Sequence, residues 1–169
     1  MKTKINFGRR IACAIAAVLL LTGFDQLTKL SARAGLQNSR DIILIDGVLQ
    51  LHYLENRGAA FGILQNRQWV FLLLAACSIA AAGLFYLRIL PEASFLPMRI
   101  CLLFLISGAA GNLIDRAVYG YVTDFIYFSL IDFPVFNFAD ICVTCSMAGI
   151  LYLVFFHYKD EDYEFLRQR

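Results

Sequence analysis

Charged residues are scarce in this chain. Asp, Glu, Lys and Arg account for 17% of its 169 residues, where about 25% is usual for a soluble domain. Apolar residues make up 60%, against roughly 45–50% in soluble domains. This composition excludes a disordered chain, a coiled coil and a nucleic-acid-binding protein. The net charge of +2 is also too small to imply a polyanionic partner. The excess of apolar residues instead indicates a membrane protein.

Histidine and cysteine are too few, or wrongly placed, for several kinds of active site. The two histidines lie far apart in the sequence, which argues against a zinc site and against a Ser–His or Cys–His nucleophile. Cys142 and Cys145 form a C-x-x-C, a spacing used in thiol–disulfide exchange. A four-helix membrane oxidoreductase also needs cysteines in its outer loops, and residues 31–67 and 117–133 contain none. We interpret the cysteines as small apolar packing residues and expect no metal and no cofactor.

Four long apolar segments predict a mainly α membrane protein with four transmembrane helices. The expected spans are residues 11–30, 68–87, 96–115 and 134–158 of a single integral membrane domain, 1–169. Within lipid each span must be helical, because its backbone N–H and C=O groups find no water there. Packed helices of a soluble bundle are the alternative, but four such segments would leave almost no sequence for a polar surface.

The distribution of Lys and Arg predicts the orientation of the spans. Basic residues precede the first span, flank the connection between spans two and three, and follow the fourth, so both termini are expected in the cytoplasm. Four arginines in the long first outer loop oppose this bias: Arg33, Arg40, Arg57 and Arg67. The N-terminal region resembles a signal peptide ending at Ala32–Arg33–Ala34, but this triplet lies too far beyond the apolar run, and we expect the first helix to be retained.

The first outer loop contains a β signal. Two apolar, β-branched runs, 42–45 and 48–54, flank Asp46–Gly47. Asp-Gly between such runs indicates a two-residue hairpin, whose turn positions both need a positive φ. We therefore expect a small β-sheet, a hairpin-containing cradle over residues 41–63, on the outer membrane surface.

Polar residues gather at the outer ends of the predicted helices and in the outer loops. An ionisable group at membrane depth costs several kcal/mol, so its default interpretation is functional. Interfacial capping and snorkelling explain any one of these residues, but they explain so many on one side poorly. The candidate site residues are Asp25, Lys29, Asn56, Gly58, Asn112, Asp115, Arg116, Asp124, Asn137 and Asp140.

Several aspartates on one rim favour a carboxylate dyad. One carboxylate acts as the base toward a water molecule while the other, protonated, donates to the attacked carbonyl. Spacing alone leaves open which two of Asp25, Asp115, Asp124 and Asp140 form the pair. A small transporter or channel with a polar outer vestibule is a further alternative, but the cytoplasmic halves of spans two to four are nearly uncharged, so no polar path crosses the bilayer.

Five motifs, in order, resemble those of lipoprotein signal peptidase, also called signal peptidase II. The resemblance covers residues 10–158. The motifs are Phe24–Lys29, Asn56–Phe61, Gly111–Arg116, Val122–Phe125 and Phe136–Asp140.

The resemblance implies a bacterial intramembrane aspartic endopeptidase that removes the signal peptide from prolipoproteins, cutting just before a diacylglyceryl-modified cysteine. Asp124 and Asp140 would be the catalytic dyad. The other matched residues would position substrate and dyad or support the site, with the role of Asp115 open. The implied partners are prolipoprotein substrates and membrane lipid, with no nucleic acid, and a monomer is expected. The implied location is the bacterial cytoplasmic (inner) membrane, with the active site toward its extracytoplasmic face.

Overall fold

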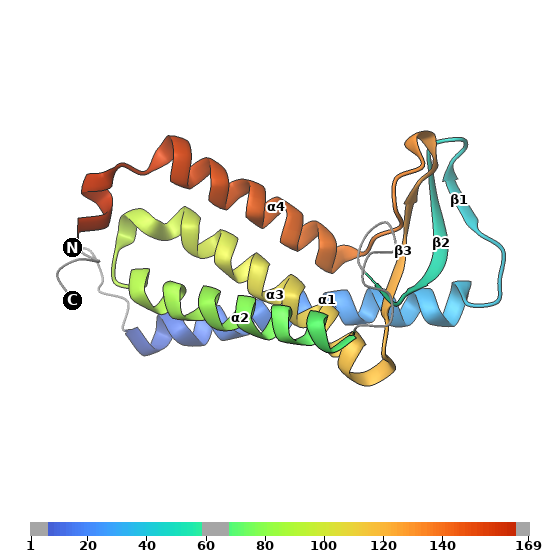
Figure 1. Ribbon diagram of the computed structural model, residues 1–169, viewed down its shortest axis with the longest axis horizontal. Helices are drawn as coiled ribbons and strands as arrows, with labels where there is room; N and C mark the ends of the chain where they lie inside the picture. Colours follow the sequence, from blue (N-terminus) through green and yellow to red (C-terminus); the bar gives the residue numbers. More distant parts are fainter. Residues whose placement is uncertain (1–6, 59–67, 165–169) are drawn as a thin grey trace.

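The computed structural model describes residues 7–58 and 68–164 of the chain. Four long helices lie side by side, and a small sheet lies across one end of them, which we call the sheet end (Figure 1). The helices are α1 (Phe7–Leu36), α2 (Gln68–Ile89), α3 (Leu96–Tyr119) and α4 (Phe138–Tyr152). Each, with the turns that extend α3 and α4, is long and apolar enough to cross a membrane. The expected fold class is therefore confirmed.

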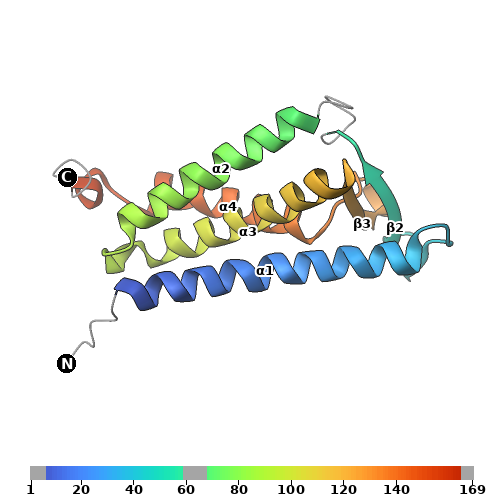
Figure 2. The same cartoon turned by 90° about the horizontal axis from the view of Figure 1, so that it is seen from below.

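Helix α1 extends well beyond the predicted span of residues 11–30. Its 30 residues measure about 45 Å, against a hydrocarbon core of about 30 Å. The additional length carries α1 past its neighbours and alongside strands β2 and β3 (Figure 2). Arg33, which the sequence analysis placed in a loop, lies in the last turn of this helix. Residues 31–34 permit a helix, and it continues through Gly35 to Leu36 because its last turns pack against β2 and β3.

Helix α4 begins at Phe138 rather than near Pro134. The side chain of Asn137 accepts a hydrogen bond from the backbone N–H of Asp140, and the Asp140 side chain accepts one from the backbone N–H of Asn137. This capping box fixes the first turn of the helix. Before it, Phe136 pairs with Ile126 in an isolated β-bridge, which keeps this stretch extended. At its other end α4 continues as one π-helical turn, Leu153–His157.

The sheet has three antiparallel strands in the order β1 (Ile42–Ile45), β2 (Leu49–Asn56) and β3 (Val122–Phe128). The predicted hairpin is present, but its turn differs. Ile45 pairs with Leu49, so three residues connect the strands, and within the turn Gly47 alone has a positive φ, at 69°. One glycine therefore suffices, whereas the two-residue turn would have needed two positive φ angles. Residues 59–63 of the expected β region lie outside the described residues.

The two ends of the helix bundle are buried in different ways. Away from the sheet, Ile89, Leu90, Phe95 and Met98 form an apolar core, each at most 1% exposed. At the sheet end the equally buried side chains are mainly polar: Asp25, Lys29, Asp115, Thr123, Asp124 and Asn137. Buried polar groups are retained only where they find partners. The polar cluster at the sheet end is therefore the candidate functional region.

Helices α3 and α4 approach each other closely at Gly108. A Cβ atom placed on Gly108 would lie 2.5 Å from the backbone oxygen of Ala139 and 2.9 Å from Val143 Cγ2. These contacts are too short for any side chain. The absence of a side chain at this position therefore sets how near α4, and Asp140 with it, comes to α3.

We predict that Gly108→Ala destabilises the protein by about 1–3 kcal/mol, because α4 has to move away from α3. A lower midpoint of thermal unfolding in detergent would measure the effect. Gly83→Ala is the matched control, since a Cβ there meets nothing within 4 Å and alanine favours the helix. Equal midpoints for Gly108→Ala and Gly83→Ala would contradict the prediction.

Candidate active site

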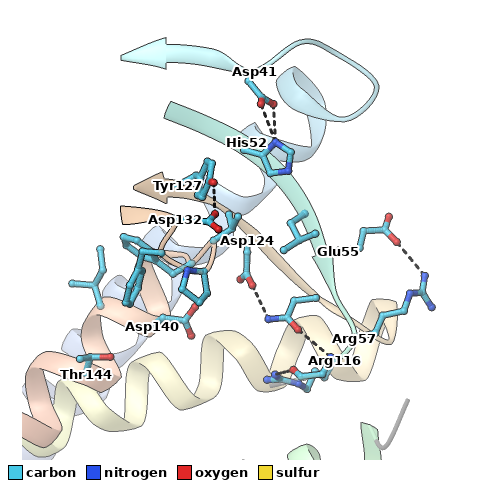
Figure 3. A pocket seen from close by; sticks show the side chains of 18 of the residues that line it. Asp41, His52, Glu55, Arg57, Arg116, Asp124, Tyr127, Asp132, Asp140 and Thr144 are labelled. Carbon is cyan, nitrogen blue, oxygen red and sulfur yellow. Dashed lines mark hydrogen bonds and ion pairs between the residues drawn. The ribbon is translucent and has the colours of Figure 1, made fainter. Parts of the chain in front are cut away.

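Asp124 and Asp140 line one cavity of about 1170 Å³ at the sheet end of the helices. Asp124 lies on β3 and Asp140 in the first turn of α4, and both side chains belong to the cavity wall (Figure 3). Asp124 is 1% exposed, and Asp140 is partly buried. A strand and a helix thus bring two carboxylates to the same space.

Each carboxylate oxygen of these two residues accepts a hydrogen bond. The oxygens of Asp124 accept from Asn56 Nδ2 at 2.8 Å and from Asn137 Nδ2 at 2.6 Å. The oxygens of Asp140 accept from Asn112 Nδ2 at 2.8 Å and from the backbone N–H of Asn137 at 3.2 Å. A carboxylate oxygen has two acceptor positions, so each oxygen keeps one position for a proton or a water molecule.

Asn137 connects the two aspartates directly. Its Oδ1 accepts from the backbone N–H of Asp140 at 3.0 Å, while its Nδ2 donates to Asp124. One side chain therefore caps α4 and contacts the carboxylate on β3. Asn137 is fully buried, so this link is shielded from competing water and fixes the helix start relative to the strand.

Lys29 determines which way the amide of Asn112 faces. Lys29 Nζ, fully buried, donates to Asn112 Oδ1 at 2.9 Å. An ammonium group has no acceptor, so the oxygen side of the amide faces Lys29 and Nδ2 faces Asp140. Lys29 is itself held by Asp25 at 2.8 Å, the i,i+4 pair that the sequence suggested.

Two further buried carboxylates hold the backbone next to Asp140 and Asp124. Asp25 Oδ1 accepts from the N–H of Ala139, the residue before Asp140, at 2.9 Å. Asp115 Oδ2 accepts from the N–H of Thr123, the residue before Asp124, also at 2.9 Å. Both cavity aspartates are thus positioned through the backbone N–H of the residue immediately preceding them.

Arg116 supplies a cation in the cavity wall. Its guanidinium lies 4.7 Å from the ring centroid of Phe71, and Nη2 makes a long contact of 3.4 Å with the carbonyl oxygen of Gly58. Its buried Nε has no hydrogen-bond partner within residues 7–58 and 68–164. Arg116 therefore has hydrogen-bonding capacity to offer a bound molecule.

The electrostatics favour a shared proton. Burial, and after it the neighbouring charge of Asp140, raises the pKa of Asp124 to about 7. Hydrogen bonds from Asn56 and Asn137 and the charge of Lys29 act in the opposite direction. Two nearby carboxylates that cannot both ionise easily titrate as one coupled unit, which is the state that acid–base catalysis by a dyad requires.

The structure brings all ten predicted site residues into one network. Gly58, the least obvious of them, donates its N–H to Asn56 Oδ1 at 3.0 Å and accepts the contact from Arg116. Their individual roles stay predictions. Three further residues belong to the network but are not among the predicted site residues: Gln26, Arg33 and Thr123. Of these, Arg33 has a signal in the sequence, because it follows Asp25 and Lys29 at helical spacing and so shares their face of α1.

Clusters of metal-ligating side chains and disulfide bonds are absent from the described residues. Within the ranges 7–58 and 68–164, no three His, Cys, Asp or Glu side chains are grouped to hold a metal ion. Cys142 and Cys145 are unpaired thiols, the first buried and the second exposed. The cavity wall also includes His52, Arg57, Tyr127 and Cys145, but the two carboxylates held by amide donors are those of Asp124 and Asp140.

Comparison with known proteins agrees with this chemistry. The family model described as signal peptidase (SPase) II matches residues 16–156. A lipoprotein signal peptidase from Clostridioides difficile is 41% identical over 86% of this chain and 97% of that protein. One from Streptococcus thermophilus is 42% identical over 91% of this chain and 97% of its own length.

Two solved structures of bacterial membrane enzymes, obtained by the in meso method, share the fold. One superposes with a TM-score of 0.76 at 29% identity, covering 85% of this chain and 88% of that chain. The other has a TM-score of 0.75 at 28% identity, over 88% and 96% of the two chains. The chain therefore belongs to the signal peptidase II family, aspartic proteases of the membrane that cleave signal peptides from prolipoproteins during lipoprotein maturation.

Proposed function

We propose that Asp124 and Asp140 are the catalytic dyad and that the scissile bond is the one just before a diacylglyceryl-modified cysteine. The observation that carries this proposal is the meeting of two carboxylates in one cavity, each with both oxygens held by amide donors. No other pair of the four candidate aspartates fits as well. Asp25 and Asp115 are fully buried, and they are occupied by Lys29 and Arg33 and by backbone N–H groups.

The reaction needs one proton on the pair. The ionised carboxylate removes a proton from a water molecule, whose oxygen attacks the peptide carbonyl carbon while the protonated carboxyl donates to the carbonyl oxygen. The tetrahedral intermediate then collapses: one of its hydroxyl groups returns a proton to the dyad, the C–N bond breaks, and the departing nitrogen takes a proton from the dyad. The dyad ends with one proton, ready for another cycle. Asn56, Asn112 and Asn137 hold the carboxylates in place throughout.

The cavity has two chemical ends that suit a lipidated precursor. One end is lined by the α4 residues Ile141 and Thr144, and the other by polar residues that include His52 on β2 and Asp132 after β3. The apolar signal segment lies along the first end, with the acyl chains left in lipid, and the chain after the cysteine leaves over the second. A helical amide is hydrogen-bonded and shielded, so the peptide unwinds locally near Arg116 and the dyad.

We further propose that the sheet end faces the extracytoplasmic side of the bacterial inner membrane, with both termini in the cytoplasm and the protein acting as a monomer. The distribution of basic residues supports this orientation. Arg33, which opposed the bias, is ion-paired with Asp115 at 2.9 Å, so one of the four outer arginines is neutralised. The exposed apolar residues of β1 suit contact with the membrane surface.

Asp124→Asn and Asp140→Asn should each abolish cleavage. Loss of acid–base catalysis alone accounts for about 10²–10⁴-fold, and an amide cannot share the proton. Gel-shift cleavage of a diacylglyceryl-modified precursor measures the rate, with unchanged thermal unfolding as evidence of folding. Asp46→Asn, in the hairpin turn, is the control and should keep full activity. Full activity of either dyad variant would contradict the proposal.

The pH dependence follows from the raised pKa of Asp124. With that pKa at about 7, the dyad keeps its proton up to about neutral pH and loses it above, so kcat/KM should fall by up to about tenfold per pH unit on the alkaline side. An aspartate near its ordinary value of 3.8 would lose the proton far earlier. Cleavage rates between about pH 5 and pH 9 test this; a rate that still rises above neutral pH would count against it.

Replacing the C-x-x-C should have little effect. Cys142→Ala with Cys145→Ala removes the thiols that a disulfide-forming enzyme would need, while the dyad remains. We expect the double variant to cleave the lipidated precursor within about threefold of the wild-type rate, since small apolar replacements cost little. Loss of cleavage in a variant with unchanged thermal unfolding would instead support thiol chemistry.

A further inference from the structure

Arg33 contacts the site from the last turn of α1, although no catalytic step uses it. Its Nη2 donates to Asp115 Oδ1 at 2.9 Å and its Nε to Thr123 Oγ1 at 2.8 Å. The face of the guanidinium lies 3.9 Å from the centroid of the Tyr119 ring. The side chain is only 12% exposed, so three contacts and burial fix its position.

Hydrogen bonds through Asp115 and Thr123 connect Arg33 to the residue next to Asp124. Asp115, which Arg33 holds from one side, accepts the backbone N–H of Thr123 on the other. Arg33 is therefore linked to Thr123 in two ways: directly, by a hydrogen bond to the Thr123 hydroxyl, and indirectly, through Asp115, which accepts from both residues. Thr123 is fully buried and immediately precedes Asp124. The orientation of the backbone at Thr123 therefore sets where β3 points the Asp124 carboxylate.

The charges also require a second cation at this place. Asp25 and Asp115 are both buried, and Lys29 lies 2.8 Å from the first but 3.7 Å from the second. An unpaired buried carboxylate is strongly destabilising. Without Arg33, Asp115 would draw Lys29 away from Asp25 and from Asn112. Arg33 thus leaves Lys29 free to orient the amide that donates to Asp140.

We propose that Arg33 is a positioning residue for peptide-bond cleavage: through Asp115 and Thr123 it holds Asp124 in the geometry that the reaction needs. The inference rests on the proposed dyad. Arg33 touches neither substrate nor the reacting carboxylates, so its effect is on the rate of the chemical step rather than on binding. Lysine cannot replace it fully, because a single ammonium lacks the planar fork that reaches Asp115 and Thr123 together.

The test compares kcat and KM of Arg33→Met and Arg33→Lys in purified full-length protein, using a diacylglyceryl-modified precursor. A displacement of about 1 Å at a reacting group costs up to about 100-fold. We therefore expect Arg33→Met to lower kcat by about 10- to 100-fold with KM changed by less than about threefold, and Arg33→Lys to restore part of kcat. Arg40→Met, at an exposed arginine after α1, is the control and should match wild type.

Rates are divided by the concentration of folded protein, which is taken from the fraction that unfolds cooperatively on heating. A variant that is only less stable then shows an unchanged kcat and does not count as support. Wild-type kcat in Arg33→Met would overturn the proposal, and wild-type kcat in Arg33→Lys would do so if Arg33→Met does not fold. A rise in KM with unchanged kcat would also overturn it, since that would mark a binding role. Activity of Asp124→Asn would instead overturn the dyad itself, so the two failures are distinguishable.

Discussion

The structure depends on burying ionic groups beside lipid. Asp25, Lys29 and Asp115 are at most 1% exposed, and charges in such surroundings persist only when paired and fully hydrogen-bonded. This requirement forces α1, α3, β3 and α4 to meet at one place, because the partners come from all four elements. The proposed dyad gains its order from that constraint: the groups that satisfy Asp25 and Asp115 include the backbone N–H groups of the residues just before Asp140 and Asp124.

Close helix packing and the ionic cluster are two aspects of one arrangement. A Cβ atom on Gly111 would overlap the Asp25 carboxylate, so the helices reach ion-pair distance only because this position has no side chain. Gly108 does the same for α3 against the backbone of α4. Glycines that look dispensable in an apolar helix thus decide whether the polar groups can contact one another.

The sequence predicted the helices and the hairpin because hydropathy and turn chemistry are local. It also indicated the rim of polar residues, and the motif resemblance separated Asp124 and Asp140 from the other aspartates. It did not predict the role of Arg33, because the extent of α1 beyond the membrane depends on contacts with β2 and β3. The start of α4 was likewise misplaced, since the Ile126–Phe136 bridge joins segments through tertiary structure.

The proposed dyad is shared between a strand and a helix, so side-chain contacts rather than a single backbone element set the separation of its two residues. Asn137 provides the most direct of these contacts, since it caps the helix of Asp140 and donates to Asp124. The arrangement suits a reaction at a membrane boundary. In the proposed dyad the strand carries the buried carboxylate, Asp124, and the helix carries the partly exposed one, Asp140. Burial raises the pKa of Asp124, while Asp140 stays accessible to water, so the pair combines a carboxyl group that favours its protonated form with one that water reaches.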